Sequence, residues 1–302
     1  MAAAWSKPWT MRQGFALGGA VILLGLGLQL LLGPVPWHLM AFPVNIFALA
    51  LLIAALALMY ALRRKVYLFG WMMHYGAAVP SLIYALGLTL LMGFTAQGAD
   101  GVPVLGQMLR FWPFVLSWCW MLLIAALATL ERIVHFKAGN IPFILNHLGV
   151  VVAVVAATLG NADRQDLRII SYRNIPEWRA VRGDGTMQEL DIAIELHKFI
   201  METYPDGSPR RFASEITVHR QRGGSTSGTV EVNHPMKVAG WKIYQYGYDT
   251  RLGAESRYST FQVVRDPWLP AVYAGIFMML AGALCLMLFS APGPAAEDKE
   301  QE

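Results

Sequence analysis

Two histidines lie in long apolar stretches of this 302-residue chain, where an ionisable side chain is costly unless it has a partner. His147 lies six residues into the stretch from Ile141 to Gly160, about 9 Å along a helix, and His74 eight residues into the stretch from Val66 to Phe94, about 12 Å. Neutral imidazole nitrogen is a good axial ligand for haem iron. We therefore expect His147 to bind the iron of a haem, with His74 as the second candidate at similar depth.

The alternative for both residues is a histidine that hydrogen-bonds a neighbouring helix. The other five histidines have weaker claims to a metal. His38 and His135 lie in loops at the two membrane surfaces, where a solvated side chain is expected. His197 lies on the polar side of a predicted strand, and His219 and His234 have no metal-like spacing with each other or with a pair of carboxylates.

The composition requires lipid around much of the chain. Of the 302 residues, 56% are hydrophobic and 15% charged, which is too apolar for a soluble protein of this size. The interval from Asn161 to Asp266 holds 15 of the 24 Lys and Arg and 14 of the 20 Asp and Glu, so it is nearly neutral. No basic face is left to bind nucleic acid, which we exclude as a partner. The two cysteines form neither a CxxC pair nor a haem-attachment motif.

The apolar stretches predict about six transmembrane helices. A helix rises about 1.5 Å per residue, so about 20 apolar residues cross the hydrocarbon core. The six stretches are Gly14 to Gly33, Val44 to Leu62, Val66 to Phe94, Phe111 to Leu130, Ile141 to Gly160 and Trp268 to Ser290. We thus predict three parts: a membrane domain of five helices over 1–160, a β-rich domain over 161–266, and a sixth helix with an acidic cytoplasmic tail over 267–302.

Basic residues of the short loops predict the orientation, because such residues stay on the cytoplasmic side. They are Lys7, Arg12, Arg63, Arg64, Lys65, Arg132 and Lys137, whereas the opposite loops hold Arg110 alone. The first helix is expected to be retained, with its N-terminus in the cytoplasm. The β-rich domain between the fifth and sixth helices is then extracytoplasmic.

Alternation of apolar and polar side chains predicts the strands of that domain. The period of two is clearest from Leu190 to His197. Further strands are expected at Arg168 to Tyr172, Glu215 to His219, Gly228 to Val232 and Trp241 to Tyr248. Turn signals between several of them favour an antiparallel sheet or sandwich.

The last of these strands carries a row of tyrosines. A strict alternation places Lys242, Tyr244, Tyr246 and Tyr248 on one face. Such a row could form a recognition surface, but sheet packing is the favoured interpretation because aromatic residues are common in strands.

Two motifs resemble one family. The first is Asn-His-Leu-Gly at 146–149, followed by Leu-Gly at 159–160; the second is Val-Asn-His-Pro-Met at 232–236, followed by Gly-Trp-Lys-Ile-Tyr-Gln at 240–245 and Tyr-Asp at 248–249. Weaker matches are Leu-Met-Gly at 91–93 and Asp-Pro at 266–267. Together they resemble the ResB-like proteins of system II cytochrome c biogenesis, over the fifth helix, the β-rich domain and the sixth helix.

The resemblance implies a subunit of a cytochrome c haem lyase complex in a bacterial inner membrane, with its soluble domain on the periplasmic side. It implies a CcsA-type membrane protein as partner, haem b held transiently and without a covalent bond, and apocytochrome c as the recipient of the haem. The partner's tryptophan-rich motif is not visible here, since the ten tryptophans are scattered. We therefore expect a non-catalytic or co-catalytic subunit rather than a complete enzyme.

Two other functions remain open at this point. A haem b-binding anchor of a respiratory complex would usually need histidine pairs in both leaflets, and the outer halves of these stretches hold none. A non-haem membrane receptor or scaffold would use the β-rich domain only to bind another protein.

Overall fold

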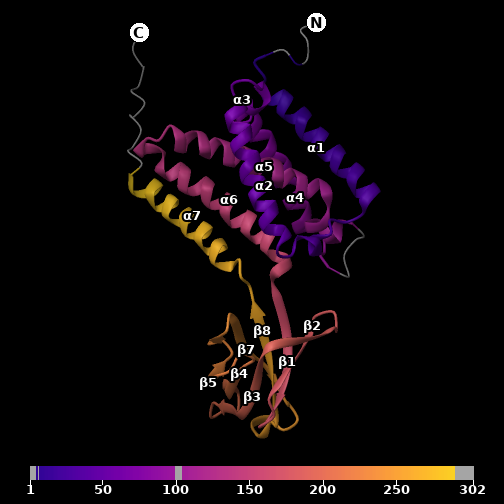
Figure 1. Cartoon of the computed structure of the whole chain (residues 1–302), viewed down its shortest axis with the longest axis vertical. Coiled ribbons are helices and arrows are strands. Elements are labelled where there is room, and N and C mark those ends of the chain that lie inside the picture. The colour runs from indigo at the N-terminus through magenta and orange to yellow at the C-terminus, as the bar shows by residue number, and fades with distance from the viewer. Residues whose placement is uncertain (1–4, 6, 99–103, 290–302) are drawn as a thin grey trace. The chain divides into compact units, whose positions relative to one another are not determined.

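A computed structural model describes residues 5, 7–98 and 104–289 (Figure 1). Within these residues, six helices are long and apolar enough to cross a membrane, which confirms the predicted multi-pass membrane protein. They are α1 (Met11–Leu32), α2 (Val44–Leu62), α4 (Tyr75–Phe94), α5 (Trp112–Val134), α6 (Ile141–Gly160) and α7 (Leu269–Phe289). The predicted acidic tail lies outside the described residues.

The third stretch is not the single helix that the sequence predicted. A short helix, α3 (Tyr67–Trp71), ends before His74, whose extended backbone begins α4. A continuous helix over 66–94 would be about 43 Å long, well beyond a hydrocarbon core of about 30 Å. The predicted depth of His74 is therefore wrong, because this residue lies at the beginning of its span.

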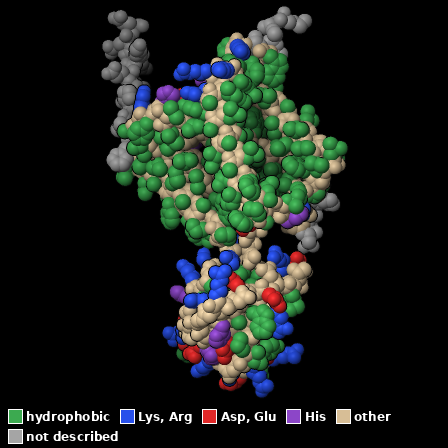
Figure 2. Space-filling view, in the orientation of Figure 1, with side chains coloured by type: hydrophobic (Ala, Val, Ile, Leu, Met, Phe, Trp, Pro, Cys, Tyr) green, Lys and Arg blue, Asp and Glu red, His purple; other side chains and the backbone are tan. Residues whose placement is uncertain are grey.

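The helices form a unit that comprises residues 1–162 and 268–302. In its described part, α1 packs on α4 and α5, α5 also contacts α2 and α6, and α6 packs closely on α7. Figure 2 shows hydrophobic side chains over the surface of this unit, as expected where lipid is the solvent. Two buried hydroxyls inside it are satisfied within their own helix: Ser117 and Thr129 each donate to the carbonyl oxygen four residues earlier, at 2.7 Å.

Residues 163–267 form a second unit, which is an eight-stranded antiparallel sheet. Its strands are β1 (Gln165–Tyr172), β2 (Glu177–Arg182), β3 (Met187–Thr203), β4 (Pro209–Arg220), β5 (Ser225–Glu231), β6 (Met236–Val238), β7 (Trp241–Tyr248) and β8 (Tyr258–Arg265). The order across the sheet is β5-β4-β3-β2-β1-β8-β7-β6. The antiparallel sheet and all five predicted strands are confirmed, whereas β2, β6 and β8 were missed.

The sheet curls around its own core, because β5 at one end contacts β6 and β7 at the other. Apolar side chains from all eight strands fill the interior, among them Leu167, Ile194, Ile216 and Phe261. At the rim of this core the indole nitrogen of Trp241 donates to Asp191 at 2.7 Å, which ties β7 to β3.

The predicted row of tyrosines is interrupted by a bulge in β7. Between Gln245 and Gly247 the register with β8 shifts by one residue, so Tyr248 pairs with the buried Ser259. The ring of Tyr248 consequently stacks on Phe199 and Phe212, with ring centres 4.9 Å and 5.1 Å away. The prediction is wrong for Tyr248, which packs inside, while Tyr246 stays exposed on the outer face.

Candidate functional site

His147 lies in the second turn of α6, and a hydrogen bond fixes its ring. Its Nδ1 atom is 3.0 Å from the carbonyl oxygen of Phe143, one turn earlier. A carbonyl oxygen only accepts, so Nδ1 carries the proton and Nε2 carries the lone pair. In the described part of the chain Nε2 has no hydrogen-bond partner, and the side chain is partly exposed. Such an imidazole can ligate a metal, and a backbone carbonyl on the other nitrogen is the usual support for that role.

The Phe143 ring stacks on this imidazole, and a guanidinium in turn stacks on the Phe143 ring. The rings of Phe143 and His147 are nearly parallel, at 17°, with centres 3.8 Å apart. On the other side of Phe143, the guanidinium of Arg132 from the last turn of α5 lies 3.6 Å from the ring centre. This stack was not predicted from the sequence, although the spacing of four residues between Phe143 and His147 on a helix indicates their contact.

Asn146 and Gly149 of the Asn-His-Leu-Gly motif face α7. A Cβ on Gly149 would lie 2.7 Å from the carbonyl oxygen of Gly275, and a Cβ on Gly282 would lie 2.7 Å from the side-chain nitrogen Nδ2 of Asn146. These residues let the two helices approach closely. His147 lies about 100° around α6 from Asn146, so helix packing with α7 accounts for Asn146 and Gly149 but not for the histidine.

His74 lies in a different environment. It lines a cavity of about 340 Å³ where the ends of three helices meet. The other lining residues are Lys7, Arg63, Arg64, Lys65, Tyr67, Gly70, Trp71 and Met73. The structure does not bring His74 and His147 together, because α4 packs mainly on α1 and α5 and α6 mainly on α5 and α7. The roles of both histidines as haem ligands stay predictions.

An apolar cavity of about 510 Å³ lies between α2, α5, α6 and α7. Its α6 wall includes Leu148, Val151 and Val155, beginning one residue after His147. No sequence signal pointed to this cavity, because its walls are ordinary apolar residues brought together from four helices. Where the structure describes the chain, no group of three or more His, Cys, Asp or Glu is placed to hold a metal ion.

Histidines of the β unit take part in local hydrogen bonds. The Nε2 atom of His219 lies 2.8 Å from a carboxylate oxygen of Glu195, and that of His197 lies 2.7 Å from the hydroxyl of Thr217. His234 is largely exposed, with its Nδ1 atom 4.0 Å from Glu231. The contacts of His219 and His197 join β4 to β3.

Arginines set the charge state of two glutamates in the same unit. The guanidinium of Arg179 bonds Glu177 at 2.8 Å and lowers the pKa of that carboxyl to about 2. Arg211 bonds both Glu202 and Glu231, and its hydrogen bond lowers the pKa of Glu231 below the usual value. Both glutamates are therefore ionised at neutral pH, as structural ion pairs of the sheet.

Comparison with known proteins bears on the part of the chain that contains His147. Residues 137–256 match the model of the ResB-like family. A stretch of 107 residues is 27% identical to the cytochrome c biogenesis protein CcsB of Prochlorococcus marinus (strain NATL1A), and one of 109 residues is 28% identical to the protein of that name from Synechococcus sp. (strain RCC307). Each match covers 35% of this chain and 24% of the relative, so the chain matches about a quarter of the length of these proteins.

One solved structure is also similar. It is a cytochrome c haem lyase, CcmF, at 13% sequence identity and a TM-score of 0.38, over 92% of this chain and 44% of that one. A likeness of this degree supports no further argument. The predicted resemblance is confirmed by the family match, which contains α6 and the strands from β1 to β7. Over residues 137–256, this chain is similar to the ResB-like family.

Proposed function

We propose that this chain is a haem-handling and assembly subunit of a system II cytochrome c maturation complex, working with a CcsA-type partner. The observation that carries the proposal is the imidazole of His147. It lies in a membrane helix within the ResB-like segment, with Nδ1 bonded to the Phe143 carbonyl oxygen and Nε2 available. An imidazole in the apolar part of a membrane helix is costly without a partner, and packing on α7 does not supply one.

The residues present fit one axial ligand of a haem. Nε2 of His147 would bind the iron, and the Phe143 carbonyl would hold the ring in the tautomer that leaves this nitrogen unprotonated. Arg132 contributes a positive charge beside the Phe143 ring, which favours an anionic ligand nearby. The bound haem would supply the vinyl groups that react with the cysteine thiols of an apocytochrome.

A second ligand to the iron would come from this chain or from its partner. His74 is the candidate from this chain, although it lies apart from His147. A histidine of the CcsA-type partner is the other source. In either case the haem is haem b, held transiently and without a covalent bond to this chain.

The β unit has a separate role in the proposal. Loop charges favour a cytoplasmic N-terminus, and residues 163–267 would then lie on the periplasmic side of a bacterial inner membrane. There the curled sheet would position apocytochrome c or the partner near the place where haem leaves the membrane. Attachment itself would depend on the partner.

The test is purification of the chain with and without the co-expressed CcsA-type partner, followed by a visible spectrum and a pyridine haemochrome assay. We expect non-covalent haem b that increases when the partner is present. A preparation that stays free of haem even with the partner would contradict the proposal and favour a non-haem receptor.

A further inference from the structure

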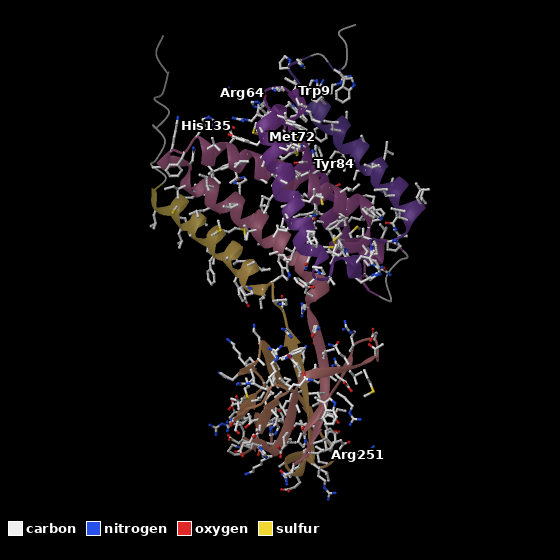
Figure 3. All side chains as sticks on the ribbon, in the orientation of Figure 1. Trp9, Arg64, Met72, Tyr84, His135 and Arg251 are labelled. Carbon is white, nitrogen blue, oxygen red and sulfur yellow. The ribbon has the colours of Figure 1, made fainter. Side chains whose placement is uncertain are left out.

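The cavity beside His74 is lined by basic residues and lies at one end of the helical unit. Lys7 precedes α1, Arg64 and Lys65 follow α2, and His74 begins α4, so the cavity lies where three spans end together. Figure 3 labels Arg64 and Trp9 at this end of the unit. Among the described residues that line it, four are Lys or Arg and none is acidic.

Most of this charge is not neutralised by the described residues. Arg63 forms an ion pair with Glu131 at 3.2 Å, and its guanidinium lies over the Tyr60 ring at 3.7 Å. Arg64 and Lys65 are exposed, and neither forms an ion pair in the described ranges. Lys7 contacts the Tyr67 ring at 4.4 Å, which leaves its charge available. An anion would therefore meet three cations without first breaking an ion pair.

Aromatic rings form the inner wall of the cavity and indicate which part of the membrane surrounds it. Trp9 lies edge-on to Tyr67 and Trp71, with ring centres 5.3 Å and 5.4 Å away. The Trp71 indole donates to the Trp9 carbonyl oxygen at 3.1 Å, and the Tyr67 hydroxyl accepts from the Trp9 amide at 2.9 Å. Bonded Trp and Tyr rings next to Lys and Arg are typical of the interface, where lipid headgroups lie.

We propose that this cavity binds the phosphate-bearing headgroup of an anionic membrane lipid. Its ligand chemistry is a phosphate oxyanion, for which Arg64 and Lys65 supply the donors and Lys7 the third charge. A lipid is the favoured source because the cavity is open at the ends of membrane spans and exposed apolar side chains, Val66 and Tyr75, flank its lining. The inference is independent of the proposed haem function.

The test is native mass spectrometry of the full chain, released from detergent after addition of phosphatidylglycerol or phosphatidylcholine. We expect tighter binding of phosphatidylglycerol. The double variant Arg64→Gln, Lys65→Gln should weaken that binding about 25-fold, at about fivefold per removed charge. The matched control Arg12→Gln, Lys137→Gln removes two exposed basic residues outside the cavity and should leave binding within about twofold.

A second variant guards against misfolding. The charge-preserving exchange Arg64→Lys, Lys65→Arg should keep phosphatidylglycerol binding, so a loss confined to the glutamine pair reports charge. Equal binding of the two lipids, or unchanged binding in the glutamine pair, would overturn the proposal. Displacement of the lipid by millimolar inorganic phosphate would show a site for free phosphate instead. If the chain binds no lipid and the glutamine pair loses haem, the cavity would be assigned to haem propionates and to His74.

Discussion

Gly149 of α6 and Gly275 of α7 face each other so closely that a Cβ on Gly149 would lie 2.7 Å from the Gly275 carbonyl oxygen. In the reverse direction, a Cβ on Gly275 would lie 2.6 Å from the Gly149 carbonyl oxygen. Both obstacles are backbone atoms, which no rotamer change can move. The two helices that flank the sheet in the sequence are thus held together by contact between their main chains.

The first prediction follows from this contact. Gly149→Ala and Gly275→Ala should each separate α6 from α7 and lower the stability of the membrane unit by about 1 to 3 kcal/mol, the usual cost of overpacking. Thermal unfolding in detergent would measure the loss. Gly87→Ala in α4 is the matched control, since a Cβ there meets no atom within 4 Å. Equal stability of all three variants would refute the close approach.

A second prediction concerns the bulge in β7. Tyr248→Ala removes a ring that contacts both Phe199 and Phe212 and should destabilise the β unit by about 2 kcal/mol. Tyr246→Ala removes an exposed ring whose contact is the Arg168 guanidinium at 4.2 Å, and should cost about 0.5 kcal/mol. Chemical denaturation followed by near-ultraviolet circular dichroism compares the two. The reverse order of stabilities would place Tyr248 outside, as strict alternation predicts.

Acid should weaken the β unit through Glu177. Its pKa in the folded state, about 2, is below the usual value because Arg179 bonds the ionised carboxylate. The ion pair therefore contributes fully above the unfolded pKa of about 4.3, and its contribution is lost as the pH falls from there towards 2.

Comparison with the variant Glu177→Gln isolates the contribution of this ion pair to the stability of the β unit. At pH 7 we expect the variant to be less stable by about 1 kcal/mol, because Arg179 is half exposed and solvent screens the pair. The difference from the natural chain should vanish near pH 2 in denaturant titrations. Glu215→Gln, a neutralised exposed glutamate on β4, serves as the control. A difference that persists unchanged at pH 2 would show that the ion pair does not cause it.

The orientation in the membrane is open to direct test. Reporter fusions after Lys65 and after Lys137 should behave as cytoplasmic, and a fusion after Ala180 as periplasmic, because basic loops stay inside. Alkaline phosphatase and green fluorescent protein fusions give opposite readouts at each point. A cytoplasmic signal at Ala180 would invert the proposed arrangement.

The sequence was sufficient where one physical signal dominated. The length of the apolar stretches predicted the membrane spans, because a helix needs about 20 apolar residues to cross the hydrocarbon core. Hydropathy did not predict the break in the helix before His74, because the residues of the preceding turn are also apolar. The strand β8 was missed because Ser259 occupies one of its buried positions and hides the alternation. The bulge that turns Tyr248 inward depends on pairing with β8, which the sequence of β7 alone does not contain.

The candidate site was predictable only in part. An imidazole in an apolar helix drew attention to His147, and this argument needs no neighbours. The stack with Arg132 depends on how α5 and α6 pack, and the cavity beside His74 depends on three helix ends meeting. Both arise from tertiary contacts between segments far apart in the chain.

The central claim, that Nε2 of His147 binds haem iron, predicts the result of one substitution. His147→Ala should leave the protein in the membrane at near-normal abundance, while its haem content per molecule falls strongly and cytochrome c maturation stops. His135→Ala, at the exposed end of α5, is the matched control and should keep both. Added imidazole should restore part of the haem by filling the open coordination position.

The decisive measurement is the pyridine haemochrome of His147→Ala co-purified with the CcsA-type partner, expressed as haem per molecule of chain. We expect a value well below that of the natural chain, with partial recovery in imidazole. If His147 only forms a hydrogen bond within the membrane unit, His147→Ala would lower stability by about 0.6 to 2 kcal/mol and leave haem per molecule unchanged. Unchanged haem together with normal maturation would contradict the assignment of His147 as a ligand.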